Sequence, residues 1–188
     1  MRRARAALLL ILAAVALIGA AGGAKADQTD PRLGDLFILL KAAPDLAAAQ
    51  PIDARIWRIW LEHSDKRTRE VTLIGASFMA AGQVELANLA FKEAIERHPD
   101  FAEAWNKRAT LRYLTGDLAG SVADCAHVLQ LEPRHYGALA GLGQIEMALR
   151  HWTAAVRWYE AALKVNPHMP GVEAALKTAR RQAGGEET

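Results

Sequence analysis

Three prolines recur at a fixed interval in the second half of the chain. Pro99, Pro133 and Pro167 lie 34 residues apart. A fixed period of this length is the signature of a stacked repeat array rather than of one globular core. Because proline lacks an N–H and disfavours helix at the residue before it, each proline should end one helical unit. The sequence therefore predicts three repeats, at residues 68–101, 102–135 and 136–169.

Each block reads as two helices separated by a break. In the first block, Gly82 interrupts two apolar helical stripes, and the third block has the same arrangement. Small residues stand where the two helices of a pair must approach closely, and large aromatic residues stand where they can fill the space between neighbouring pairs. The first block carries Val71, Ile74, Gly75, Phe78, Ala87, Phe91 and Ala94, and the third carries Leu139, Leu142, Gly143, Ala155, Tyr159 and Ala162.

This pattern resembles the tetratricopeptide repeat, whose W-x2-L-G-x2-Y, A-x3-F and P positions have a period of about 34 residues. The resemblance covers residues 68–169. It implies an all-α fold, an α-solenoid of three helix pairs in which Trp105, Phe91 and Tyr159 lie between neighbouring pairs. It also implies that the first helix of each pair lines a concave groove that can hold another polypeptide.

The middle block departs from the family pattern. Arg108 stands at a leucine position, and Cys125 and Ser121 replace apolar partners. An arginine between two helices must be paired, so the sequence predicts a structural ion pair between Arg108 and Asp124, with ligand binding by Arg108 as the alternative. Cys125, the single cysteine, cannot form an internal disulfide and is expected to be buried.

The first 26 residues look like a secretory signal peptide. Basic residues precede an apolar stretch from Ala6 to Ala21, and Ala24-Lys25-Ala26 forms a small-x-small cleavage site. We expect a bacterial periplasmic protein after cleavage near Ala26. The alternative is an N-terminal membrane anchor facing the periplasm, in which case only this uncleaved segment contacts the membrane.

The net charge argues against nucleic acid as a partner. The chain has 23 Lys and Arg against 21 Asp and Glu. Four of the basic residues and none of the acidic ones belong to the predicted signal peptide, so the remainder carries a net charge of −2. Neither nucleic acid nor an acidic membrane surface is implied as a partner.

Further helices are expected on both sides of the repeats. Residues 27–67 should form an N-terminal hairpin, a cap or degenerate repeat stacked on the first repeat, with its second helix kinked or restarted at Pro51. Its "RIWRIWLEH" stretch, residues 55–63, is expected to be capping core, and an exposed partner patch is the alternative. Residues 170–188 should form a capping helix followed by a disordered tail from residue 183.

No pattern of catalytic or metal-binding residues is found. The six histidines form no i, i+4 pair, and the serines lack a neighbouring base. "GLGQIE", residues 141–146, has no preceding strand and is better explained by helix packing. The sequence therefore predicts a protein that is not an enzyme and has no metal, no cofactor and no small-molecule substrate.

The family resemblance places the ligand at positions two, five, nine and twelve of each block. Family members that hold acidic C-terminal peptides use lysine and asparagine at several of these positions, whereas Thr72, Ala76 and Ala140 stand here, so a carboxylate clamp is disfavoured. Amide side chains can pair with a peptide backbone, and tyrosine and methionine give adaptable apolar contact. The expected groove residues are Arg69, Thr72, Met79, Asn106, Thr110, Tyr113, Gln144 and Met147, and Glu103, Gly137 and Ala140 share the same register.

The leading hypothesis is a non-enzymatic periplasmic adaptor that binds a peptide segment of an envelope protein in its concave groove. A solvated groove without a ligand fits the same residues almost as well. The sequence is also compatible with a self-assembling structural module and with an accessory subunit of an envelope enzyme or assembly complex.

Overall fold

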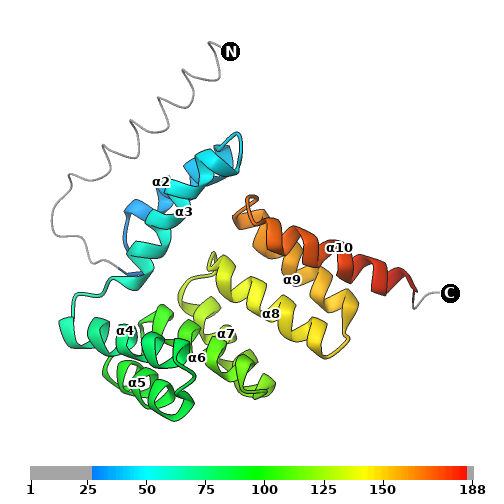
Figure 1. Cartoon of the computed structure of the whole chain (residues 1–188). Coiled ribbons are helices and arrows are strands. Elements are labelled where there is room, and N and C mark those ends of the chain that lie inside the picture. Colours follow the sequence, from blue (N-terminus) through cyan, green and yellow to red (C-terminus); the bar gives the residue numbers. More distant parts are fainter. Residues whose placement is uncertain (1–26, 186–188) are drawn as a thin grey trace.

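The computed structural model describes residues 27–185, which fold into nine α-helices without a strand (Figure 1). The predicted all-α solenoid is confirmed. The predicted signal peptide, residues 1–26, lies outside the described residues, as do residues 186–188. No helix of the described part of the chain is both long and apolar enough to cross a bilayer.

Three antiparallel helix pairs stack side by side, and a further helix covers the last one (Figure 1). Pro99 and Pro133 lie in the turns between consecutive pairs, and Pro167 lies in the turn between the last pair and the helix that covers it, so each proline follows a helix pair as the 34-residue period predicted. The pairs are α4 (Lys66–Ala80) with α5 (Val84–Arg97), α6 (Ala102–Leu114) with α7 (Leu118–Leu131), and α8 (Tyr136–Ala148) with α9 (Trp152–Val165), and α10 (Pro170–Gly185) packs on α9.

Helix approach within a pair depends on glycine. A Cβ atom on Gly75 would lie 2.6 Å from Cε1 of Phe91, and one on Gly143 would lie 2.5 Å from Tyr159. Both aromatic rings are buried, and Phe91 also contacts Leu111 of the next pair. The large and small positions of the repeat therefore pack as the sequence pattern predicted.

The N-terminal hairpin consists of α2 (Arg32–Ala42) and α3 (Leu46–Leu61). The Asp45 carboxylate accepts a hydrogen bond from the Ala48 N–H (2.9 Å) and caps α3. The helix continues through Pro51, so the expected restart at that residue does not occur. The two helices enclose an apolar core that includes Leu33, Leu36, Leu40, Ile52 and Ile56.

The hairpin does not stack on the first repeat as expected. Its core continues instead into Tyr136, at the start of α8, and Met169, before α10. The first repeat is therefore left uncovered on the face of α4 that a preceding helix pair would bury. Ile74 of the first repeat is 43% exposed, whereas Leu142, at the same position of the third repeat, is 4% exposed and packs beside Cys125.

The C-terminal capping helix is longer than expected. α10 ends at Gly185, so residues 183–185 are helical and do not begin the predicted disordered tail. Val172, Leu176 and Ala179 of α10 are buried against the last pair. This apolar stripe matches the cap that the sequence predicted.

Candidate functional site

The first helices of the repeats form a shallow central pocket of about 40 Å³ between α6 and α8. It brings together four of the residues that the family register selected, namely Asn106, Thr110, Tyr113 and Gln144. Ser121 and Cys125 of α7 also line it. We call the concave face around this pocket the groove.

Three of the selected side chains are open to a ligand in the groove. Thr110 and Gln144 are exposed, and Tyr113 is partly exposed. The Thr110 hydroxyl donates to the backbone oxygen of Asn106 (3.0 Å), and its lone pairs can still accept. Met79 and Met147 are half-buried and pack into the clusters on either side of the groove.

Three other selected residues are engaged within the chain. Thr72 is 1% exposed and donates its hydroxyl to the Thr68 oxygen (2.8 Å). Arg69 donates to the backbone oxygen of His63 (3.1 Å). Asn106 is 8% exposed and donates to the Glu103 carboxylate (2.9 Å). The family register identifies the helix face, but the polar groups of these side chains already have partners.

Glu103 is the centre of a buried charged network at the N-terminal edge of the groove. Lys107 Nζ lies 3.0 Å from Oε1, and His135 Nε2 lies 3.1 Å from Oε2. His135 Nδ1 accepts the Ala138 N–H, so the ring proton is on Nε2 and is donated to Glu103. Burial alone would raise the pKa of Glu103, but the His135 hydrogen bond and the Lys107 charge outweigh it and lower that pKa.

This network fastens the N-terminal hairpin to the groove. The Trp60 ring stacks on His135, with centroids 4.1 Å apart and planes inclined by 13°. Trp57 meets Tyr136 edge to face at 5.5 Å. Trp60 is 1% exposed. The capping-core interpretation of "RIWRIWLEH" is therefore confirmed for Trp60, which packs on His135 and Tyr136. The end of the stretch contacts the end of the first repeat, where the His63 ring lies 4.3 Å from His98 and 4.8 Å from Phe101.

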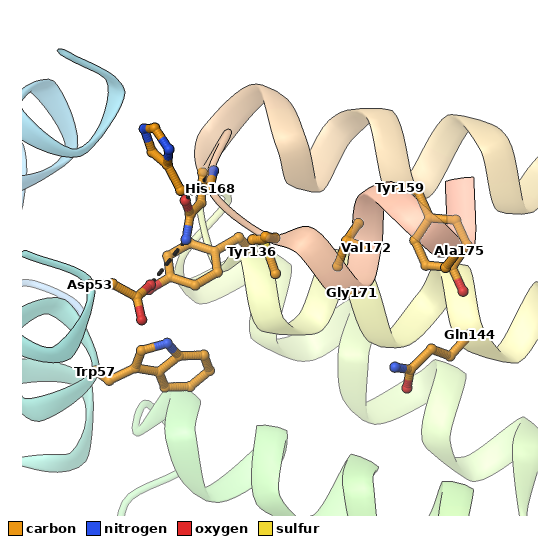
Figure 2. A pocket seen from close by; sticks show the side chains of 11 residues that line it. Asp53, Trp57, Tyr136, Gln144, Tyr159, His168, Gly171, Val172 and Ala175 are labelled. Atoms are coloured by element: carbon orange, nitrogen blue, oxygen red, sulfur yellow. Dashed lines mark hydrogen bonds between the residues drawn. The ribbon is translucent and has the colours of Figure 1, made fainter. Parts of the chain in front are cut away.

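A second, larger pocket of about 390 Å³ separates α3 from α8 and α10 (Figure 2). Asp53 and Trp57 face it from α3, Tyr136 and Gln144 from α8, and Val172 from α10. Gln144 lines this pocket as well as the groove pocket. We call it the Asp53 pocket. Sequence reasoning missed it because it exists only where the hairpin meets the third repeat.

The middle repeat contains the predicted ion pair. Arg108 donates from Nε and Nη2 to the two oxygens of Asp124 (2.9 and 2.8 Å), and Arg112 Nη1 adds a third contact at 2.9 Å. Asp124 is buried, and in this bidentate pair both of its carboxylate oxygens accept hydrogen bonds from the Arg108 guanidinium. The pair is therefore structural, as predicted.

Cys125 is buried, as predicted, and its thiol is held in the neutral form. Burial, with a smaller contribution from the neighbouring Asp124 charge, raises the pKa of this thiol to about 12. Within residues 27–185, no group of three or more histidine, cysteine, aspartate or glutamate residues is placed to hold a metal ion.

Solved structures share this fold. The first tetratricopeptide domain of Spaghetti (RPAP3), bound to an HSP90 peptide, has a TM-score of 0.61 and 17% identity, over 63% of this chain and 94% of that one. The TPR2B domain of yeast Sti1, in a complex with pHsp70, gives 0.59 and 20% over 63% and 99%. The Sgt2 domain of Aspergillus fumigatus gives 0.62 and 17% over 65% and 83%.

Sequence relatives agree with the fold, although no protein-family model matches the chain. Tetratricopeptide repeat protein 36 of Danio rerio is 35% identical over 66 residues, which is 35% of each chain. A TPR repeat-containing protein of Rhizobium etli is 36% identical over 138 residues, 69% of this chain and 67% of that protein. With its three stacked helix pairs, the chain therefore belongs to the tetratricopeptide repeat proteins.

Proposed function

We propose that this protein is a non-enzymatic adaptor of the periplasm that holds a segment of an envelope protein in its groove. Tetratricopeptide domains typically mediate protein–protein interaction, and the solved Spaghetti domain holds a peptide. The observation that carries the proposal is the pocket between α6 and α8, where Thr110, Tyr113 and Gln144 face solvent together.

The groove favours an extended segment without an acidic tail. Gln144 and Thr110 can pair with a peptide backbone, and Tyr113 offers an apolar surface beside them. The basic side chains of α6 have acidic partners: Lys107 lies 3.0 Å from Glu103, and Arg108 and Arg112 lie 2.8 and 2.9 Å from Asp124. A peptide carboxylate therefore finds no unengaged cation of α6 at this point, in keeping with the absence of the carboxylate-clamp residues.

The sequence of residues 1–26 supports the proposed location. Its charged start, apolar stretch and Ala24-Lys25-Ala26 site are those of an export signal. Fractionation of cells, with mass spectrometry of the N-terminus, tests this part. A mature chain that begins at Asp27 in the periplasmic fraction is expected, an intact N-terminus in the membrane fraction favours the anchor, and an intact chain in the cytoplasm contradicts export.

Crosslinking tests the groove itself. A photoreactive residue at position 113 should capture a partner that the same residue at position 89 does not, because Leu89 is 60% exposed but lies on α5, outside the groove. Replacing Tyr113 and Gln144 together by alanine should weaken capture, and thermal unfolding should change little because both side chains are partly or fully exposed. Equal capture at positions 89 and 113 would contradict a groove ligand.

One observation favours self-assembly as a second candidate function. Leu73 and Ile74 are 48% and 43% exposed at the end of the stack that the hairpin leaves open. A stack end normally has a polar face. Sedimentation velocity of the wild type and of Ile74→Glu tests this candidate, since a dimer that the substitution abolishes supports it, and a wild-type monomer at high concentration contradicts it.

A further inference from the structure

Asp53 is an acidic group without a cationic partner at the wall of the Asp53 pocket. Its Oδ1 accepts hydrogen bonds from the Tyr136 hydroxyl (2.6 Å) and from Nδ2 of Asn166 (3.0 Å). Among the residues that the structure describes, no lysine, arginine or histidine forms an ion pair with it, and Oδ2 receives no hydrogen bond. Burial raises the pKa of Asp53 despite the two hydrogen bonds, because no positive charge compensates for the lost water.

Two aromatic rings stand next to this carboxylate. Trp57 lies one helical turn after Asp53 on α3, and the Tyr136 ring meets the Trp57 ring edge to face at 5.5 Å. Aromatic faces attract cations, most strongly where water is excluded. Lys107 Nζ lies 5.9 Å from the Trp57 ring centroid, but its charge is held by Glu103, and it forms no ion pair with Asp53.

His168 lines the same pocket, but its Nε2 is buried and has no hydrogen-bond partner in the described part of the chain. A nitrogen without solvent exposure does not meet a ligand in the pocket. The Asp53 carboxylate is therefore the acceptor on which the pocket depends.

We propose that the Asp53 pocket receives the side chain of a lysine or arginine belonging to the polypeptide held in the groove. This inference rests on the proposed function, because Gln144 lines both pockets and a bound segment can pass from Tyr113 toward Asp53. Asp53 Oδ2 accepts the cation's hydrogen bond, and Trp57 and Tyr136 flank its stem. A pocket of about 390 Å³ is large enough for either side chain.

Peptide pools test the preference directly. The purified protein is immobilised and offered random nonapeptides whose central residue is fixed as lysine, arginine, norleucine or glutamate. We expect the lysine and arginine pools to be retained about tenfold or more over norleucine, because only a cationic side chain gains the charged hydrogen bond to Asp53 and the cation–π contact with the aromatic rings. Norleucine is the matched probe because it keeps the apolar stem of lysine.

Asp53→Asn should abolish this preference without unfolding the protein. The amide oxygen can still accept from Tyr136 and Asn166, so the contacts that hold the hairpin remain. Asp35→Asn is the matched control, because it removes the same charge from an exposed position on α2. The control should behave as the wild type.

Butylammonium gives a measurement that does not depend on the peptide. Its addition should shift the Trp57 indole N–H resonance, assigned with Trp57→Phe, in the wild type and not in Asp53→Asn. Absence of this shift in the wild type overturns the cation pocket. A shift without a preference for the lysine and arginine pools also overturns the proposal, since the pocket then takes a free cation and not a side chain of the bound segment.

The same experiment separates the two proposals. If all four pools are retained equally and Tyr113→Ala weakens them all, the groove function stands and the cation pocket falls. If no pool is retained but butylammonium shifts the Trp57 resonance, the groove function falls and the pocket is a small-cation site. If neither response is seen, both proposals fall.

Discussion

The ion pair of the middle repeat provides a quantitative test of how this array is held together. Arg108→Met removes two charged hydrogen bonds, of 2.9 and 2.8 Å, from the buried Asp124. Methionine keeps an apolar stem of similar length but also removes the cation–π contact of the guanidinium carbon, which lies 4.9 Å from the Trp105 ring centroid. The perturbation is therefore mainly electrostatic.

The expected loss of unfolding free energy depends on which charged group each substitution leaves without a partner. Hydrogen bonds to charged groups are worth about 1.5–3 kcal/mol each, and an orphaned buried charge costs about 3–5 kcal/mol. Asp124 keeps Arg112 at 2.9 Å, so Arg108→Met should cost less than full orphaning, about 2–3 kcal/mol. Asp124→Leu should cost a similar amount, about 2–3 kcal/mol, because Arg108 then has only partial access to water.

The double variant, Arg108→Met with Asp124→Leu, gives the coupling energy between the two side chains. In the third repeat, Leu142 stands at the position that Arg108 has in the second repeat, and it is packed in an apolar cluster. An apolar pair should therefore be tolerated in the second repeat. Since Arg112 still loses its contact with Asp124, we expect the double variant to cost about 2 kcal/mol and the coupling energy to be about 2–4 kcal/mol. Urea unfolding followed by far-UV circular dichroism measures all four proteins. A coupling energy below about 0.5 kcal/mol would refute the argument.

Three further predictions follow from buried groups. Folding lowers the pKa of Glu103, so the carboxylate stabilises the fold above its ordinary pKa of 4.5, and this stabilisation is lost as the pH falls below that value. The urea midpoint of the wild type should therefore fall on acidification, and that of Glu103→Gln should fall less. The Cys125 thiol, with its pKa raised to about 12, should react with iodoacetamide only after unfolding, and rapid labelling of the native protein would contradict its burial. Gly143→Ala should destabilise the fold by about 1–3 kcal/mol because the new Cβ meets Tyr159, whereas Gly34→Ala on α2, with no atom within 4 Å, should stabilise it by up to about 1 kcal/mol in the same thermal melts.

Periodicity was sufficient to predict the repeats because their contacts are local. Gly75 and Phe91 face each other within one helix pair, and Arg108 and Asp124 are 16 residues apart. Spacing alone places such residues opposite each other. The family resemblance implied the face that carries Tyr113, but it could not show that Asn106 is engaged by Glu103.

The placement of the hairpin could not be predicted in this way. Asp53 meets Tyr136 and Asn166 across 83 and 113 residues, and no repeat pattern relates such distant positions. Glu103 stands in the predicted groove register and His135 near a predicted turn, so their burial could not be read from the sequence. A charged side chain at a buried position needs a partner, but the sequence does not say which segment supplies it.

The attachment of the hairpin to the third repeat changes how the array comes apart. Repeats that touch only their neighbours fray independently from either end. Here the N-terminal hairpin is tied to the third helix pair by the hydrogen bonds that Asp53 accepts from Tyr136 and Asn166. Opening the hairpin or the last pair must therefore break the same contacts. The two ends of the described array are coupled, and neither can open without cost to the other.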